Sequence, residues 1–163
     1  MEEFCLHTLN SNWTIWYHKS NDTNWNLESY IKLATLSSVE DFSIVYNSLK
    51  PIHVQNSMLF VMREGINPIW EAPENKDGGC FSFKIYRQDI YEAWNELSCL
   101  LIGENILKDK TDFSCINGIS ISPKKTFSII KIWLKNNDNN EANKFHNINK
   151  FNFTESIYKK HVQ

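Results

Sequence analysis

Six short segments in which apolar and polar residues alternate constrain the fold of this chain more than any other feature. Alternation with a period of two is typical of strands that bury one face and expose the other. Gly78 and Gly79, and the SPKK sequence at 122–125, predict turns between neighbouring strands and favour an antiparallel meander. The six segments are WTIWYH (13–18), SMLFVMRE (57–64), CFSFKIY (80–86), INGISIS (116–122), FSIIKIW (127–133) and SIYKK (156–160).

Helical periodicity occupies three intervals between these strands. Ser37 and Glu40 predict a capping box in front of VEDFSIVYNSL at 39–49. An apolar stripe runs through 88–105, and the Asn-rich interval 139–151 predicts a weaker third helix. The residues that share a face in the first two intervals are Phe42, Tyr46 and Leu49, and Ile90, Trp94, Leu97 and Leu101. Strands and helices without a βαβ rhythm predict an α+β fold, with one sheet and helices on one face.

The chain length of 163 residues predicts one domain, residues 1–163, with a short N-terminal arm at 1–8. A net charge of −2 means that any contact with nucleic acid is local and shaped, because no broad basic surface exists. The four cysteines lack CxxC spacing, which favours a reducing compartment over disulfides or zinc. The sequence MEEFCLHTLN does not read as a signal peptide, and no segment has the length of a membrane span. We therefore expect a monomer in the cytoplasm, with the nucleus as a second compartment.

Enzyme motifs are missing from the sequence. It contains no GxSxG, HExxH or Walker pattern, and its five histidines are scattered without a nucleophile nearby. We expect no enzymatic activity, no catalytic residue, no metal and no cofactor.

Aromatic residues in loops are the strongest functional signal. Trp70 and Glu71 lie between two prolines in a turn-rich segment, and Trp25 lies in the polar segment NDTNWNLES. Two loop tryptophans can hold a planar ring between them, and Glu71 can accept two hydrogen bonds from the N–H donors of guanine. For any single Trp the alternative is burial in an aromatic core.

Three lysines are candidates for phosphate contact. Lys124 and Lys125 lie in the predicted SPKK turn, and Lys131 lies two residues before Trp133 on the same strand face. The alternative for the lysine pair is a solvated turn.

Several segments, in this order and at this spacing, resemble the eukaryotic translation initiation factor 4E family, which binds the mRNA cap. They are HTLNSNWTIWYH, SVEDFSIVYNSL, GINPIWEAPENKDGG, WNELSCLLIGE and IIKIW, and the resemblance runs from about His7 to Tyr158. It implies a curved antiparallel sheet of about eight strands backed by three helices. It also implies that Trp25 and Trp70 sandwich a methylated guanine, that Glu71 pairs with the base, and that Trp133 contacts the methyl group.

Other positions depart from the family pattern around the phosphates. Cys80 stands where the family has Arg after Gly-Gly, and Ile129 stands at a usual Lys position. Lys124 falls on the main Arg position, so we expect Lys124, Lys125 and Lys131 to bind the phosphates.

The family also binds proteins on the opposite face of the molecule, through a short helical motif of the scaffold factor 4G or of inhibitory binding proteins. Ser43 replaces the Trp of that surface, and Asn95 and Cys99 replace leucines. The positions that we assign to this partner surface are His7, Val39, Ser43, Asn95, Glu96, Cys99, Ile102 and Gly103.

The resemblance implies a factor that binds the 7-methylguanosine cap of mRNA in translation initiation. The polar residues Ser43 and Asn95 favour an alternative, a cap-binding repressor or cap-sequestering factor with altered scaffold binding. A third hypothesis is a protein-interaction module that no longer binds the cap, which fits Cys80 and Ile129 but not the four retained residues of the slot.

Overall fold

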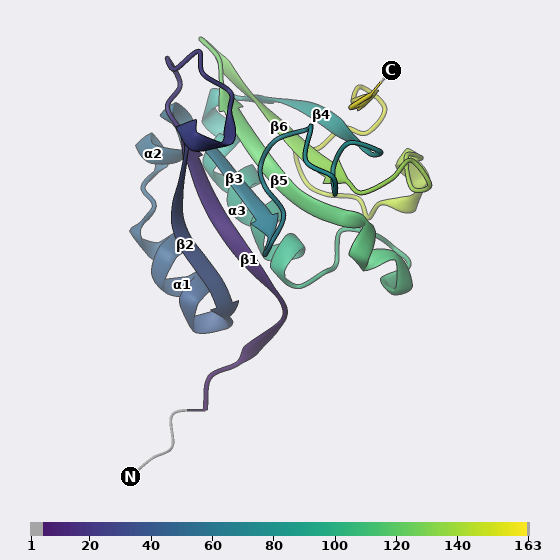
Figure 1. The fold of residues 1–163 in the computed structure, drawn as a ribbon, viewed down its shortest axis with the longest axis horizontal. Coiled ribbons are helices and arrows are strands. Elements are labelled where there is room, and N and C mark those ends of the chain that lie inside the picture. Colours follow the sequence, from purple (N-terminus) through teal and green to yellow (C-terminus); the bar gives the residue numbers. More distant parts are fainter. Residues whose placement is uncertain (1–4, 163) are drawn as a thin grey trace.

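A seven-stranded antiparallel sheet forms the body of the protein in a computed structural model that describes residues 5–162 (Figure 1). The strand order is β2-β1-β3-β5-β6-β4-β7. The strands are β1 (Thr8–His18), β2 (Tyr30–Ser38), β3 (Met58–Arg63), β4 (Gly79–Tyr86), β5 (Ile116–Pro123), β6 (Phe127–Leu134) and β7 (Ile157–Lys160).

Three α-helices cover one face of the sheet in the described chain: α1 (Val39–Ser48), α2 (Pro51–Asn56) and α3 (Ile90–Ile102) (Figure 1). Four short 3-10 helices lie at Leu27–Ser29, Arg87–Asp89, Lys110–Cys115 and Ala142–Lys144. The predicted α+β class, with one curved antiparallel sheet and helices on one face, is confirmed, with seven strands where the resemblance implies about eight. No helix within residues 5–162 is both long and apolar enough to span a membrane.

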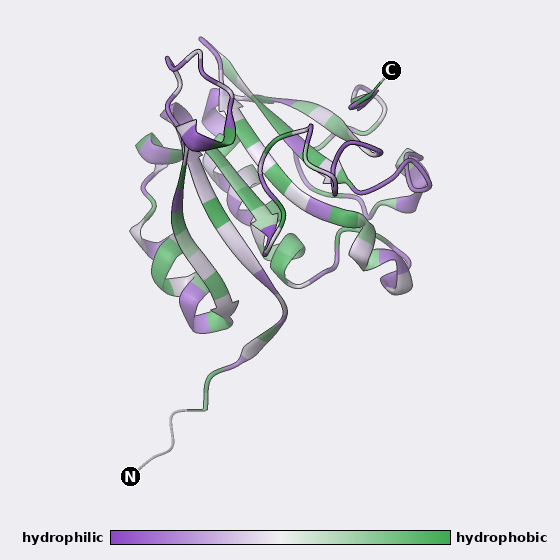
Figure 2. Ribbon diagram, in the orientation of Figure 1, coloured by the Kyte–Doolittle hydropathy of each residue, from purple (hydrophilic) through white to green (hydrophobic). Residues whose placement is uncertain are grey.

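The alternating pattern places the large core between the sheet and the helices. Figure 2 shows hydrophobic and hydrophilic residues alternating along the strands. The predicted stripe on α3 is buried in this core, as are Tyr46 of α1 and the inward residues of β4 and β6. A second, smaller cluster of buried residues lies apart from this core. Its members are Met58, Phe60, Met62, Cys80 and Trp133.

Two local predictions are wrong, one by a shift of a single residue and one in the topology. The capping box of α1 uses Ser38 and Asp41, because the Ser38 hydroxyl accepts from the Asp41 amide at 3.0 Å and Asp41 accepts from the Ser38 amide at 3.0 Å. Glu40 instead accepts hydrogen bonds from His7. Gly78 and Gly79 do not join neighbouring strands, because β5 and β6 lie between β3 and β4.

The predicted third helix at 139–151 is also wrong. Only Ala142–Lys144 is helical there, since Asn side chains compete for backbone hydrogen bonds. Phe145, Ile148 and Phe151 are nevertheless buried, so the apolar spacing serves the core from an irregular segment. The structure has a different additional α-helix, α2, which was not predicted from the sequence. It begins at Pro51, where the missing amide proton costs nothing because no helical hydrogen bond needs it. The edge strand β2 is absent from the sequence prediction.

Candidate functional site

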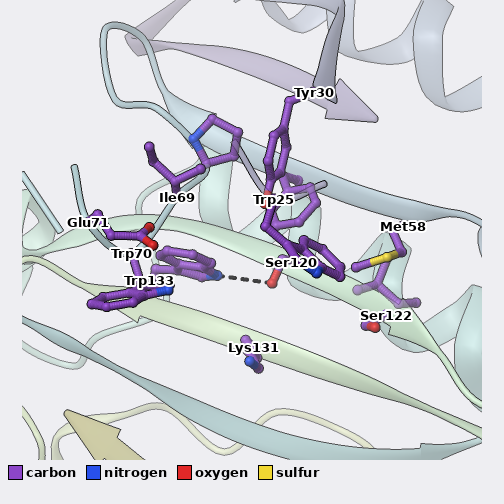
Figure 3. Close-up of a pocket in the computed structure, with 13 residues that line it drawn as sticks. Trp25, Tyr30, Met58, Ile69, Trp70, Glu71, Ser120, Ser122, Lys131 and Trp133 are labelled. Atoms are coloured by element: carbon purple, nitrogen blue, oxygen red, sulfur yellow. Dashed lines mark hydrogen bonds between the residues drawn. The ribbon is translucent and has the colours of Figure 1, made fainter. Parts of the chain in front are cut away.

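A cavity of about 250 Å³ lies between two loops on the face of the sheet that the helices leave uncovered. The loop between β1 and β2 carries Trp25, and the loop between β3 and β4 carries Trp70 and Glu71. These residues line the cavity together with Lys131 and Trp133, and Figure 3 shows Trp70 and Glu71 on one side and Trp25 on the other. The fold therefore brings together residues that are separated by more than one hundred positions in the chain.

Trp25 is half exposed, at 51%, and one face of its ring is already occupied. The ring stacks on the buried His18 ring with a centroid distance of 4.3 Å and an interplanar angle of 7°. His18 Nε2 lies 2.8 Å from the carbonyl oxygen of Asn24 and 3.1 Å from the Ser29 hydroxyl. A carbonyl can only accept, so Nε2 carries the proton and donates. His18 thus holds the loop of Trp25 by a ring stack and by hydrogen bonds.

The sequence prediction missed His18. Scattered histidines gave no reason to select it, and only its place at the end of a strand, one loop before Trp25, could have drawn attention to it. Its contacts depend on how the loop folds back onto β1, which the periodicity of the strand does not describe.

The loop of Trp70 is fixed by the buried side-chain amide of a residue within it. Asn75 is fully buried, and its Nδ2 donates to the carbonyl oxygens of Asn67 at 2.9 Å and Ile69 at 2.8 Å. Its Oδ1 accepts from Asn117 Nδ2 of β5 at 2.9 Å, which ties the loop to the sheet. Gly78 ends the loop, where a Cβ atom would lie 1.8 Å from the carbonyl oxygen of Leu134. These contacts leave Trp70 49% exposed and Glu71 exposed at the cavity.

Trp133 is a fixed part of the cavity wall. It is 6% exposed, and its Nε1 donates to the Ser120 hydroxyl of β5 at 2.9 Å (Figure 3). Phe60 of β3 packs against its ring edge-to-face at 6.4 Å between centroids. Tyr30 lines the cavity as well, and burial, followed by the negative charge of Glu71, raises the pKa of its hydroxyl to about 12.

The three predicted phosphate lysines do not lie together. Lys131 lines the cavity, whereas Lys124 and Lys125 lie exposed in the β5–β6 hairpin and line neither this cavity nor the next. The next cavity, of about 360 Å³, shares Trp70, Lys131 and Trp133 with the first and adds Lys159 of β7. The sequence prediction missed Lys159, because only the pairing of β7 with β4 brings it there.

A thiol–imidazole pair lies in this second cavity. Cys80 Sγ is 3.0 Å from His161 Nε2, and His161 Nδ1 donates to the carbonyl oxygen of Asn75 at 2.7 Å. Burial raises the pKa of the Cys80 thiol to about 12, and burial also lowers the pKa of His161. Both groups are therefore neutral at pH 7, and the thiol donates to the imidazole. Lysine side chains supply the positive charge of this cavity.

The predicted partner surface lies at the start of α1 and along α3, on the helix side of the molecule. His7 is tied to α1, because its carbonyl accepts from the Val39 amide at 2.8 Å and its ring lies 2.7 Å from Glu40. Val39 is 45% exposed, whereas Ile102 is only 8% exposed and contributes little accessible surface. The remaining predicted residues are exposed or partly exposed: Ser43, Asn95, Glu96, Cys99 and Gly103.

Comparison with known proteins gives one consistent family. A family model described as eukaryotic initiation factor 4E matches residues 8–161. The eukaryotic translation initiation factor 4E of Candida albicans is 33% identical over 148 residues, which are 84% of this chain and 69% of that protein. Such relatives are longer than this chain, which spans 43% of the length of the Acanthamoeba polyphaga mimivirus homolog of this factor.

Solved structures give the same result. Ascaris suum eIF4E-3 in complex with the m7G cap has a TM-score of 0.74 and 25% identity, over 85% of this chain and 79% of that one. Schistosome eIF4E complexed with m7GpppG and 4E-BP has a TM-score of 0.73 and 28% identity, over 85% and 76%.

Proposed function

We propose, from the premise that this chain belongs to the eukaryotic initiation factor 4E family, that it binds the 7-methylguanosine cap of mRNA and acts in translation initiation. The observation that supports this most is one cavity bordered by two half-exposed tryptophans and a carboxylate. Exposed tryptophans are costly in water, and their placement on two facing loops fits a flat ligand.

The base enters between Trp25 and Trp70 in this proposal. Stacking on each ring contributes about 1–3 kcal/mol, and the positive charge of a methylated guanine adds a cation–π attraction. His18 covers the far face of Trp25, so the bound base extends an existing stack to four layers. The wall is held in place before the ligand arrives, which lowers the ordering cost of binding.

Glu71 selects the base. Its two carboxylate oxygens accept hydrogen bonds from the N1–H and the exocyclic amine of guanine, and adenine lacks this pair of donors. Trp133 contacts the methyl group from the wall of the cavity. Lys131 meets the first phosphates, and Lys159 extends the positive charge into the adjoining cavity.

Lys124 and Lys125 reach only phosphates that have left the cavity, since they lie in the hairpin beyond it. No step of this function needs a catalytic group, a metal or a cofactor, and the chain acts as a binding protein in the cytoplasm.

An alternative is a cap-binding repressor or cap-sequestering factor. Polar Ser43 and Asn95 occupy the helix-side surface, and the burial of Ile102 removes one of its apolar residues. Solved relatives include complexes with the binding proteins 4E-BP and Mextli. We therefore propose that the scaffold factor 4G, or a protein with a similar helical motif, binds this surface weakly.

Titration of intrinsic Trp fluorescence with 7-methyl-GTP and with GTP tests the proposal. Two exposed tryptophans at the cavity should be quenched by the methylated ligand at much lower concentration than by GTP. The Trp25→Ala variant should lose part of this quenching, while buried Trp13 and Trp94 continue to fluoresce. Equal responses to both ligands would instead favour an interaction module without cap recognition.

A further inference from the structure

We propose that a strip of the sheet beyond the cavity, formed by Lys84, Tyr86 and Phe127, binds the single-stranded nucleotides that follow the cap. This inference rests on the proposed cap binding, because a cap held in the slot fixes which nucleotides of the same RNA reach the strip. The occupant is a nucleic acid strand, with bases that stack and phosphates that carry negative charge.

The strip continues directly from the slot. Strands β4 and β6 pair residue by residue, from Cys80 with Trp133 to Tyr86 with Phe127, without a register shift. Alternate residues of both strands therefore share one face, while Phe81, Phe83 and Ile85 point into the core on the other. Phe127 lies six positions before Trp133, so it is about 20 Å along β6 from that part of the wall. Ser122, which also lines the cavity, pairs with Ile129, two positions from Phe127.

The side chains at the far end suit a stacked base beside a phosphate. Tyr86 is 55% exposed, although it is a large aromatic residue on a sheet. Lys84 Nζ lies 5.2 Å from the Tyr86 ring and 4.6 Å from the Phe127 ring, measured to the centroids. A lysine held between two rings offers a fixed cation next to two aromatic surfaces, which is the composition of single-strand binding grooves.

The charge of this face fits a polyanion. The eight outward positions of β4 and β6 include Lys84 and Lys131 and no carboxylate. The hairpin lysines Lys124 and Lys125 lie at the same end, since the Lys124 amide donates to the Phe127 carbonyl at 2.8 Å. The lysines that do not line the slot thus become part of a continuous path from it.

Binding of a short capped RNA, compared with binding of 7-methyl-GTP, tests the proposal. Wild type should bind the capped RNA about tenfold more tightly than 7-methyl-GTP, because of the added stacking. Tyr86→Ala should remove this difference and leave the affinity for 7-methyl-GTP unchanged. The exposed position of Tyr86 means that this variant should fold.

A second lysine that lies over an aromatic ring gives the matched control. Lys32 of β2 lies 5.1 Å above the Trp16 ring, so Lys32→Ala removes the same charge and the same type of interaction at the opposite end of the sheet. Lys84→Ala should reduce the salt dependence of capped-RNA binding by about 0.7 in log–log slope for each phosphate that is no longer neutralised. Lys32→Ala should leave that slope at the wild-type value. Equal effects of the two variants would overturn the proposal.

Uncapped single-stranded RNA separates this inference from the proposed function. If 7-methyl-GTP fails to bind, cap recognition is wrong, but weak binding of uncapped RNA that Tyr86→Ala abolishes would still support the strip. Uncapped binding that is insensitive to Tyr86→Ala would refute it. Competition by polyglutamate as strong as by RNA would also refute it, because polyglutamate has charge but no bases to stack.

Discussion

His18 should control cap affinity without touching the ligand. Its ring carries Trp25 on one face, and its Nε2 donates into the loop that holds Trp25. Replacing His18 by Phe keeps a flat ring but removes the donor, and replacing it by Ala removes both. Part of the binding free energy of the ligand is then used to order the loop of Trp25, so the measured affinity falls.

The expected magnitudes follow from these interactions. The hydrogen bonding of Nε2 contributes about 1 kcal/mol, and the parallel ring stack contributes about 1 kcal/mol more. His18→Phe should therefore weaken 7-methyl-GTP binding by about fivefold, and His18→Ala by roughly thirtyfold. Amide exchange in residues 19–29 of the free protein should accelerate in the same order.

Calorimetric titration of a double-mutant cycle decides whether His18 acts through Trp25. In the Trp25→Ala background, His18→Ala should cause no further loss of affinity. Met62→Ala is the control for general destabilisation, because Met62 is fully buried in the small cluster but does not line the cavity. The reasoning fails if the two losses add in full, or if Met62→Ala weakens binding as much as His18→Ala does.

Four further changes have defined outcomes. Trp70→Ala should weaken 7-methyl-GTP binding by about 2 kcal/mol in calorimetry while the unfolding midpoint stays unchanged, and wild-type affinity would exclude it from the slot. Glu71→Gln should lower affinity about tenfold and reduce discrimination against 7-methyl-adenine nucleotides, and retained discrimination would remove Glu71 from base recognition. Ser43→Trp combined with Asn95→Leu should raise the affinity for a scaffold-derived helical peptide about thirtyfold, and tight binding by the unmodified protein would contradict this. Burial lowers the pKa of His161, so as the pH falls the unfolded chain is protonated at a higher pH than the folded chain. The contribution of His161 to the free energy of unfolding should therefore be full above pH about 6.5 and should fall below it. His161→Asn should flatten this dependence in denaturant titrations, and an unaltered slope would contradict the assignment.

Local periodicity was sufficient to predict much of the fold. Alternation in the sequence decides which side chains of a strand share a face, and the predicted strand CFSFKIY accordingly buries Phe81 and Phe83 together in the core. The apolar stripe of α3 was equally predictable, because a helix brings residues three and four positions apart to one face. Prolines and turn residues around Trp70 predicted its exposure for a similarly local reason, since such segments belong at the surface.

The order of the strands could not be read from the sequence, because a period of two fixes a face but not a neighbour. That order separates β3 from β4 by two strands and brings Lys159 beside Cys80, 79 positions earlier in the chain. The hairpin lysines Lys124 and Lys125 do not line the cavity, although Ser122, two positions before Lys124, does. Their place in the turn between β5 and β6, and not sequence likeness, decides this.

The support beneath Trp25 was also decided only in three dimensions. A loop of polar residues gives no periodic signal, and its fold is selected by the hydrogen bonds of Asn24 and Ser29 to a buried ring on β1. The sequence therefore determined which residues are available for a site. Long-range packing, in which each contact depends on every other strand being in place, decided which of them meet.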